Sequence, residues 1–253
     1  MSFSRRRYGK DNYLYLLAAD EDAALVDPGD PEVAVEVARR CGVKPRWILH
    51  THGHADHTGG SSRLRRELGA TVMGHRADAD RFAPDVDVSG LPELELGRLR
   101  VRVHPAPGHT PGSVLYEWEG RLFTGDTLFW GGCGNCRHGG DPARLAETFL
   151  GTLAQLGPSL TVHPGHDYAE ANLPFVLELE PGNRAASARL EAVRRARASG
   201  AEPEAATLGD ERQVNPFLRV ATPEVLSELC RRGEAPETPK AAFVALRRLR
   251  DAW

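Results

Sequence analysis

The residues with the clearest chemical potential in this sequence lie between positions 51 and 60. The stretch Thr-His-Gly-His-Ala-Asp-His-Thr-Gly-Gly contains His52, His54, Asp56 and His57. His52 and His54 are two residues apart, so in an extended backbone their rings point to the same side. Asp56 and His57 fall at the expected start of a helix and can face a second point. Imidazole and carboxylate groups bind zinc, iron or manganese, so this spacing predicts two metal ions sharing one loop. The alternative, a polar loop in which Asp56 only caps a helix, is disfavoured by the density of histidines before a Gly-Gly pair.

Three more candidate ligands, His109, Asp126 and His166, each follow an expected strand. Together the candidates are too many for one tetrahedral ion and suit two. We expect Asp126 to bridge the ions, because it stands alone between the loops of His109 and His166. The two sets that we assign to the ions are His52, His54 and His109 for the first, and Asp56, His57 and His166 for the second.

A metal pair of this kind predicts a hydrolase. A bridging water would lose its proton near neutral pH, because the ions lower its pKa from 15.7 to about 7. The hydroxide would attack a carbonyl carbon, and the net positive charge of the centre would stabilise the oxyanion. We assign the catalytic role to the carboxylates Asp56 and Asp126. A thioester suits this site, since a thiolate with a pKa near 8.5 leaves without a strong general acid.

The other histidines and the cysteine pair are interpreted as structural. We expect His50 and His163, which end strands just before a ligand loop, to contact the ligands from outside at most. The pair Cys133 and Cys136 forms a Cys-x-x-Cys, which alone is weak evidence for redox or metal chemistry. We predict two free thiols near the site. The remaining histidines with a structural interpretation are His75, His104 and His138.

Alternating strands and helices are expected to position these side chains. The strands are expected at 11–17, 23–26, 47–50, 70–73, 99–103, 114–118, 121–124 and 161–163, and the helices at 31–40, 61–68 and 141–156. The candidate ligands follow strand ends, where α/β sheets bind ligands. We therefore predict a layered α/β domain over residues 1–170.

The pattern after residue 170 is entirely helical. The expected helices cover 172–179, 183–199, 223–230 and 239–253, which predicts a small helical extension over residues 171–253. The helix at 183–199 carries five arginines and one glutamate, Glu191. It is either a solvated face or an anion-facing wall beside the metal loop.

Composition excludes several classes of protein. The 253-residue chain is 41% apolar and has a net charge of −3, which gives no case for nucleic-acid or membrane binding. We find no run of about 20 apolar residues, and no apolar segment follows the basic N-terminus, so neither a spanning helix nor a signal peptide is predicted. The four cysteines are few for a disulfide-stapled secreted domain. We expect a cytoplasmic monomer that binds a small molecule.

The motif T-H-x-H-x-D-H at 51–57, with Gly-His109-Thr, Gly-Asp126-Thr and Gly-His166-Asp, resembles the metallo-β-lactamase fold superfamily. That resemblance implies a four-layer αββα sandwich with the metals at the sheet edge. Within the superfamily the chain most resembles the glyoxalase II (hydroxyacylglutathione hydrolase) family over nearly its whole length. The likeness is strongest beyond the sandwich, at Glu-Pro-Gly-Asn (180–183) and Asn-Pro-Phe-Leu-Arg (215–219).

The resemblance implies hydrolysis of S-D-lactoylglutathione to D-lactate and glutathione, as in methylglyoxal detoxification, with two zinc ions or with iron or manganese. It also implies glutathione contacts at Tyr168, Arg247 and Arg250. The loop after Gly-Cys-Gly (132–134) departs from the family, because Asn135 and Arg137 stand where typical members place a lysine and a tyrosine that hold the tripeptide. Arg137 could still pair with a glycyl carboxylate. A different thiol carrier therefore stays open.

Three rival interpretations follow from the same residues. A persulfide dioxygenase of this superfamily keeps similar histidines around one iron, but such enzymes generally lack the long helical extension. A nuclease of the same fold is disfavoured by the net charge of −3 and by the lack of an RNA-binding module. A structural zinc module is disfavoured because such sites are usually closed and rich in cysteine.

Overall fold

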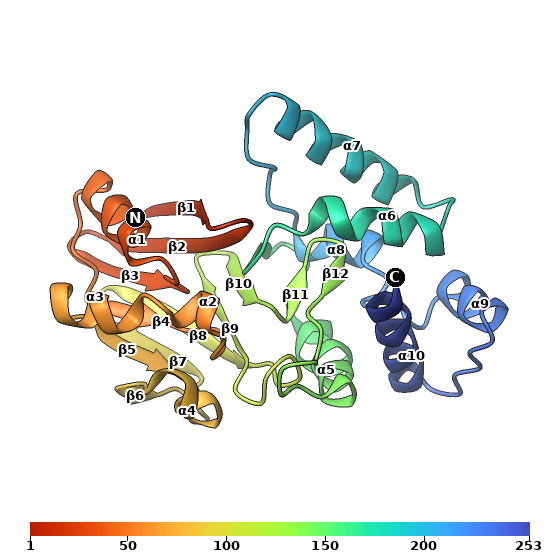
Figure 1. The fold of residues 1–253 in the computed structure, drawn as a ribbon, viewed down its shortest axis with the longest axis horizontal. Coiled ribbons are helices and arrows are strands. Elements are labelled where there is room, and N and C mark those ends of the chain that lie inside the picture. The colour runs from red at the N-terminus through yellow and green to blue at the C-terminus, as the bar shows by residue number, and fades with distance from the viewer.

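The computed structural model describes residues 1–253 and contains two mixed sheets flanked by helices (Figure 1). The six-stranded sheet, in spatial order, consists of β1 (Ser2–Tyr8), β2 (Asn12–Ala19), β3 (Asp22–Val26), β4 (Trp47–Leu49), β5 (Thr71–Gly74) and β6 (Val86–Asp87). The five-stranded sheet, in spatial order, consists of β13 (Thr161–Pro164), β10 (Arg121–Gly125), β9 (Val114–Trp118), β8 (Leu99–Pro105) and β7 (Glu93–Leu96). A short hairpin pairs β11 (Leu128–Phe129) with β12 (Gly132–Cys133).

The helices fall into two groups along the chain. Those of the sandwich are α1 (Pro31–Arg40), α2 (Ala55–Thr58), α3 (Ser61–Leu68), α4 (Ala79–Phe82) and α5 (Pro142–Thr148). Helix α5 continues into a π-helical segment, Phe149–Leu153. The helices of the extension are α6 (Ala169–Leu179), α7 (Arg184–Ala198), α8 (Leu208–Val214), α9 (Pro223–Arg231) and α10 (Pro239–Ala252).

Local sequence signals account for the elements that lead into the site. Helix α1 begins where the side chain of Asp30 accepts a hydrogen bond from the Val33 amide, with Pro31 in the first turn. Strand β8 buries Leu99, Val101 and Val103 and exposes the arginines between them. This alternation is the period of two that the sequence predicts for a half-buried strand.

The two faces of the first sheet contribute to two separate apolar clusters. On β2, Tyr15 and Leu17 belong to the larger cluster together with Val101 of the second sheet. The intervening Leu16 belongs to a smaller cluster that includes Leu64 of α3. Because successive strand residues point to opposite faces, β2 is buried on both sides, between helices and the second sheet. The layers are those of the αββα sandwich.

The helical extension shares the larger apolar cluster of the sandwich. Phe149, after α5, packs its ring 5.0 Å from that of Phe243 on α10, and Phe217 lies 5.1 Å from Phe243. In Figure 1, α10 lies beside α5, while α6 and α7 pack against each other above them in this view. The extension and the sandwich therefore share one core.

The structure adds elements that the sequence analysis did not predict. Strand β1 pairs with β2 along its whole length, although its three consecutive arginines give no alternating pattern. Arg5 stacks on Tyr13 at 5.0 Å and donates to the carbonyl of Pro203 at 2.7 Å, so its partners lie far away in sequence. Helix α8 is also new, although Thr207 and Asp210 form a capping box there.

The predicted absence of a strand after residue 170 is confirmed, because every regular element there is a helix. The helix expected at 141–156 is observed as α5 and its π-helical continuation. No helix is both long enough and apolar enough to span a membrane.

Candidate metal centre and substrate pocket

Every predicted metal ligand lies just beyond a strand end. The loop 51–60 leaves β4, and the Thr51 amide donates to Asp27 Oδ1 at 2.9 Å. His57 lies on α2, whose N-cap residue is His54 and which has no side-chain cap. Asp56 therefore does not act as a helix cap, and its carboxylate is available for another role.

Four ligand atoms form the first cluster. His54 Nδ1 lies 3.1 Å from His52 Nε2 and 3.0 Å from His109 Nε2. Asp126 Oδ2 lies 3.5 Å from His109 Nε2. All four atoms lie within 4.8 Å of one another. This is the first set that the sequence predicts, with Asp126 added.

The second cluster lies against the same carboxylate, with Asp126 Oδ2 at 3.5 Å from His166 Nε2. His57 Nε2 lies 3.2 Å from His166 Nε2, and Asp56 Oδ2 lies 3.2 Å from that same atom of His166. Asp126 Oδ1 is 3.3 Å from His57 Nε2. Asp126 thus lies against both clusters, and the structure brings all the predicted ligands together.

Outer partners fix the histidine rings of both clusters. His57 Nδ1 lies 3.2 Å from Asp27 Oδ2, and His166 Nδ1 lies 2.8 Å from Asp11 Oδ1. His109 Nδ1 lies 2.6 Å from the carbonyl oxygen of Asn135. Such contacts orient the remaining ring nitrogen and set its tautomer.

The sequence analysis did not identify Asp11 and Asp27 as outer partners. Both are acidic residues at the ends of strands on the first sheet, which is the only sequence signal that they carry. Asp27 also accepts the Thr51 hydroxyl at 2.6 Å, so one carboxylate organises both the loop and a ligand.

The donor set fits divalent cations. Asp126 Oδ1 is buried and makes no well-formed hydrogen bond, its nearest group being His57 Nε2 at 3.3 Å, although a buried carboxylate oxygen normally makes one. Burial lowers the pKa of His52 and of His109, which keeps both imidazoles neutral as ligation requires. Burial also opposes protonation of His57, but the Asp126 and Asp27 carboxylates outweigh it and raise the pKa of His57 well above its usual value. The cluster therefore carries an excess of negative charge that favours cations.

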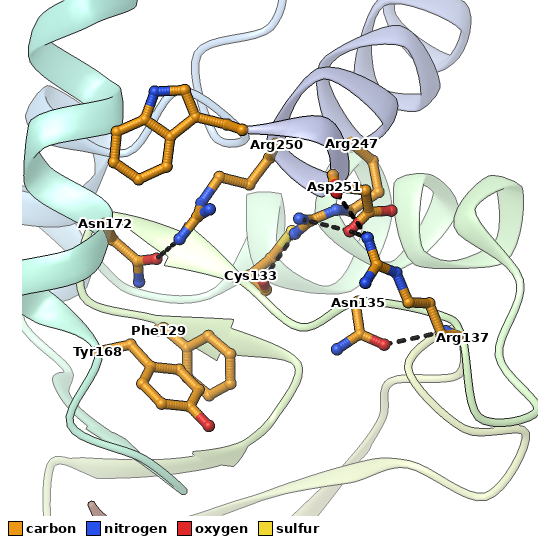
Figure 2. A pocket seen from close by; sticks show the side chains of 10 residues that line it. Phe129, Cys133, Asn135, Arg137, Tyr168, Asn172, Arg247, Arg250 and Asp251 are labelled. Atoms are coloured by element: carbon orange, nitrogen blue, oxygen red, sulfur yellow. Dashed lines mark hydrogen bonds and ion pairs between the residues drawn. The ribbon is translucent and has the colours of Figure 1, made fainter.

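A cavity of about 250 Å³, whose lining side chains are shown in Figure 2, includes Tyr168, which contacts the second cluster. The side chains predicted to contact substrate all line it, and they are Asn135, Arg137, Tyr168, Arg247 and Arg250. The Tyr168 ring stacks on the ring of His166 with centroids 4.8 Å apart, so the pocket adjoins the metal ligands directly. Burial raises the pKa of Tyr168, and its hydroxyl is a neutral donor at physiological pH.

The arginines of the pocket differ in how their N–H groups are used. Arg247 is 5% exposed and donates to the Cys133 carbonyl at 2.9 Å and to Asp251 at 2.9 Å. Arg137 donates to the backbone carbonyl of Asp251 at 2.6 Å. Arg250 makes one bond, of 3.3 Å, to Asn172 Oδ1. Arg137 and Arg250 thus each use one N–H group and keep unused donors, and the bond that Arg250 makes is the longer one (Figure 2).

Comparison with known proteins identifies the family. A model of the hydroxyacylglutathione hydrolase C-terminus matches residues 167–253, and a model of the metallo-beta-lactamase superfamily matches residues 8–171. A hydroxyacylglutathione hydrolase from Anaeromyxobacter dehalogenans (strain 2CP-C) is 64% identical over 253 residues, which cover 99% of each chain. The chain belongs to the hydroxyacylglutathione hydrolase family. It is a metal-dependent hydrolase, and the predicted resemblance to glyoxalase II is confirmed.

Solved structures confirm the fold of this hydroxyacylglutathione hydrolase family member. The BLEG-1 B3 metallo-beta-lactamase is similar with a TM-score of 0.67 and 25% identity, over 86% of this chain and 99% of that one. ETHE1 from Myxococcus xanthus has a TM-score of 0.69 and 24% identity, over 100% of this chain and 99% of that one. The likeness to ETHE1 shows the fold alone.

In this member of the hydroxyacylglutathione hydrolase family the Cys133–Cys136 pair consists of free thiols, as predicted. Burial raises the pKa of Cys133 to about 11 and that of Cys136 to about 12. Both thiols are therefore protonated at neutral pH and are poor nucleophiles.

The histidines outside the clusters have structural contacts. His50 Nε2 lies 2.5 Å from Ser61 Oγ, and His50 Nδ1 lies 3.7 Å from Asp27 Oδ1, so His50 touches an outer partner of the ligands. His163 packs among aromatic rings, with Phe3 at 4.9 Å and Phe123 at 5.4 Å.

The basic helix α7 does not form the anion-facing wall considered from its sequence. Arg197 contacts Asp167 at 2.6 Å and Glu170 at 3.1 Å, and Arg195 contacts Glu191 at 3.7 Å. No residue of α7 lines the pocket beside the metal ligands. Two of these acidic partners explain the difference, because Glu170 lies on α6 and Asp167 on the loop that precedes it, and the sequence pattern of α7 does not reveal them.

Proposed function

We propose that this enzyme hydrolyses S-D-lactoylglutathione to D-lactate and glutathione. The observation that carries the proposal is the arrangement of two ligand clusters around Asp126, next to a cavity lined by three arginines. Glutathione carries two carboxylates, which guanidinium groups bind well. A thioester whose tripeptide occupies this cavity would have its carbonyl carbon near the clusters, because Tyr168 both lines the cavity and stacks on His166 of the second cluster.

We assign the ions to the clusters as the sequence predicts. His52, His54 and His109 would hold the first ion, and Asp56, His57 and His166 would hold the second. Asp126 lies against both clusters and would contribute to both. When bound, such ions provide hydroxide at neutral pH and stabilise negative charge on a carbonyl oxygen. We propose zinc, with iron or manganese as the alternatives that the same donors accept.

The chain's own residues prepare the site for this reaction. Asp11 and Asp27 hold the rings of His166 and His57 so that their Nε2 atoms face inward. Tyr168 offers a neutral hydroxyl beside the ligands, and Arg250 offers free N–H groups for a carboxylate of the tripeptide. Because the leaving thiolate is a weak base, the site needs no dedicated general acid.

We further propose that residues 1–170 form the catalytic part and residues 171–253 the substrate-binding part, acting as a cytoplasmic monomer. One chain supplies all candidate ligands and all pocket residues, which supports a site that needs no second subunit. The four free cysteines are typical of a reducing compartment.

The thiol carrier is the least constrained part of the proposal. Asn135 Oδ1 accepts the Arg137 amide at 2.9 Å, and Arg137 reaches Asp251, so this loop binds its own neighbours in place of a lysine and a tyrosine. Arg137 is 61% exposed and could turn toward a glycyl carboxylate. The persulfide dioxygenase alternative is disfavoured by the match of residues 167–253 to the hydrolase C-terminus.

The deciding experiment combines elemental analysis with a panel of thioesters on different thiol carriers. We expect two divalent ions per chain and fastest hydrolysis of S-D-lactoylglutathione. Chelation should abolish turnover, and added zinc should restore it. One iron per chain with oxygen consumption would support the dioxygenase, whereas turnover by a fully metal-stripped enzyme would contradict the mechanism.

A further inference from the structure

We propose that Trp253 is a positioning residue for substrate binding, which holds the guanidinium of Arg250 toward the pocket. The proposal deepens the proposed function and rests on it, because it concerns how the pocket recognises a carboxylate of the thiol carrier. Trp253 itself lines the cavity and is 51% exposed.

Arg250 lies in a notch between two aromatic rings. Its guanidinium carbon is 4.9 Å from the ring centroid of Trp253 and 5.4 Å from that of Phe175. The two rings are themselves 5.7 Å apart at 66°, so their planes form a corner. A guanidinium within about 6 Å of an aromatic centroid is attracted by the ring's quadrupole. This corner restricts where the Arg250 side chain can point.

A hydrogen bond also anchors the Trp253 indole. Its Nε1 donates to Glu178 Oε2 at 2.5 Å. Glu178 and Phe175 both lie on α6, as does Asn172, the hydrogen-bond acceptor of Arg250. Helix α6 therefore provides both the anchor of the indole ring and the second contact of the guanidinium, and Trp253 connects α6 to the end of α10.

Arg250 needs such support more than the neighbouring Arg247. Arg247 is buried and held by the carbonyl of Cys133 and the carboxylate of Asp251. Arg250 makes one long bond, so ordering it on substrate binding would cost side-chain entropy. If the aromatic rings already hold the Arg250 side chain in place, that entropy cost is reduced and substrate binds more tightly. The rings do not need to contact the reacting bond for this effect.

The first test compares Trp253→Ala and Trp253→Phe with the wild-type enzyme. We expect Trp253→Ala to raise KM for S-D-lactoylglutathione about three- to fivefold, as loss of a cation–π contact predicts, with kcat within about twofold. Trp253→Phe keeps an aromatic ring but loses the hydrogen bond to Glu178. Its KM should therefore lie between that of the wild-type enzyme and that of Trp253→Ala. Hydrolysis of a small thioester without carboxylates should be the same in all three enzymes.

A double-mutant cycle shows whether Trp253 acts through Arg250. In an Arg250→Ala background, Trp253→Ala should raise KM no further, because the group that it positions is gone. Glu178→Ala should reproduce the effect of Trp253→Phe. Arg232 pairs with Glu178 at 3.0 Å and with Glu228 at 2.6 Å. Arg232→Ala is therefore the matched control, because it removes these two ion pairs and leaves the hydrogen bond between Trp253 and Glu178 in place.

Fluorescence gives a readout that does not depend on turnover. None of the other three tryptophans, Trp47, Trp118 and Trp130, lines the cavity, so an S-alkylglutathione in the pocket should change mainly the emission of Trp253. The change should be absent in Trp253→Phe, which still binds the ligand by calorimetry.

The outcomes separate this inference from the proposed function. An enzyme that hydrolyses S-D-lactoylglutathione, but whose KM is unchanged in Trp253→Ala, would overturn the role of Trp253 alone. Additive effects in the double mutant would also overturn it. Failure of the wild-type enzyme to hydrolyse any glutathione thioester would overturn the proposed function instead.

Discussion

At the scale of single residues, the histidines of the two clusters differ in how firmly they are held. His57 and His166 each face an aspartate through the outer ring nitrogen. His54 has no such partner, since its Nε2 reaches only the carbonyl oxygen of His138, at 3.5 Å. It is also only partly buried, so its ring contributes little to packing. His54 therefore offers the cleanest separation of ligand function from stability.

We predict that His54→Ala abolishes thioester hydrolysis while the protein stays folded. Changes in outer partners typically cost about 10- to 100-fold in metal affinity or activity, and loss of a direct ligand should cost more. Steady-state kinetics, metal content and thermal unfolding measure the three effects. His138→Ala is the control, because its exposed ring lies edge-on at 6.0 Å from that of His54 but belongs to neither ligand cluster, and the substitution keeps the backbone carbonyl that His54 reaches. A His54→Ala enzyme with normal turnover would refute the ligand assignment.

The second residue prediction concerns Arg250. Its unused donors face the pocket, and a charge-assisted hydrogen bond contributes about 1.5 to 3 kcal/mol, so Arg250→Ala should raise KM for glutathione thioesters about tenfold or more. The value of kcat should change little, since the arginine does not contact the reacting bond. Arg248→Ala is the matched control on the same helix, because Arg248 pairs with Glu234 at 2.9 Å on an exposed face. A fall in kcat alone would show that Arg250 is not a substrate clamp.

At the scale of elements, helix α8 fixes the β11–β12 hairpin that forms part of the pocket wall. Glu211 Oε2 accepts the Gly131 amide at 2.9 Å and the Asn215 side chain at 3.1 Å. The same Asn215 amide donates to the carbonyls of Phe129 at 3.1 Å and Gly132 at 2.9 Å. One buried polar network thus positions Phe129 in the pocket.

The charge of this network predicts a pH dependence of stability. Burial raises the pKa of Glu211 to about 7, above its ordinary value of 4.5. The folded chain then binds this proton more tightly than the unfolded chain, so the free energy of unfolding contributed by Glu211 falls as pH rises from 4.5 to 7.

Glu211→Gln should remove this pH-dependent fall in the free energy of unfolding. The glutamine amide oxygen can still accept both hydrogen bonds, and the amide cannot ionise. We expect the free energy of unfolding at pH 8 to rise by up to about 3 kcal/mol and to change little at pH 4. Urea unfolding at the two pH values measures the difference. The exposed Glu191→Gln should have no effect at either pH. An equal change at both pH values would mean that Glu211 is not protonated in the folded state near neutrality.

At the scale of the whole molecule, the sandwich and the extension depend on one another. The larger apolar cluster joins Leu145 and Phe149 of the sandwich to Phe217, Phe243 and Leu246 of the extension. The pocket is likewise shared, since the hairpin supplies Phe129 while α10 supplies Arg250. Although family models divide the chain near residue 170, the packing is continuous across that point.

We therefore predict that a chain of residues 1–170 does not fold as a stable monomer. It would expose Trp130 and Phe149, which are 1% and 2% exposed in the full chain. Exposed patches of this kind favour aggregation. Size-exclusion chromatography and urea unfolding of the fragment, beside the full chain, measure the effect. A monomeric fragment with the full chain's unfolding midpoint would show that the extension is dispensable for folding.

The sequence by itself determined the ligand types, the strands that precede them and the helical character of the extension. Those features are local, because alternation in β8, the Asp30-Pro31 start of α1 and the histidine spacing each involve a few neighbouring residues. Tertiary structure alone decided which distant groups became partners. Asp11 and His166 are 155 positions apart, and β1 is recognisable only from its pairing with β2. A short sequence window cannot contain such contacts, because they depend on which elements pack together. For the same reason the separate roles of Arg247 and Arg250, three residues from one another, emerge only from what surrounds each side chain.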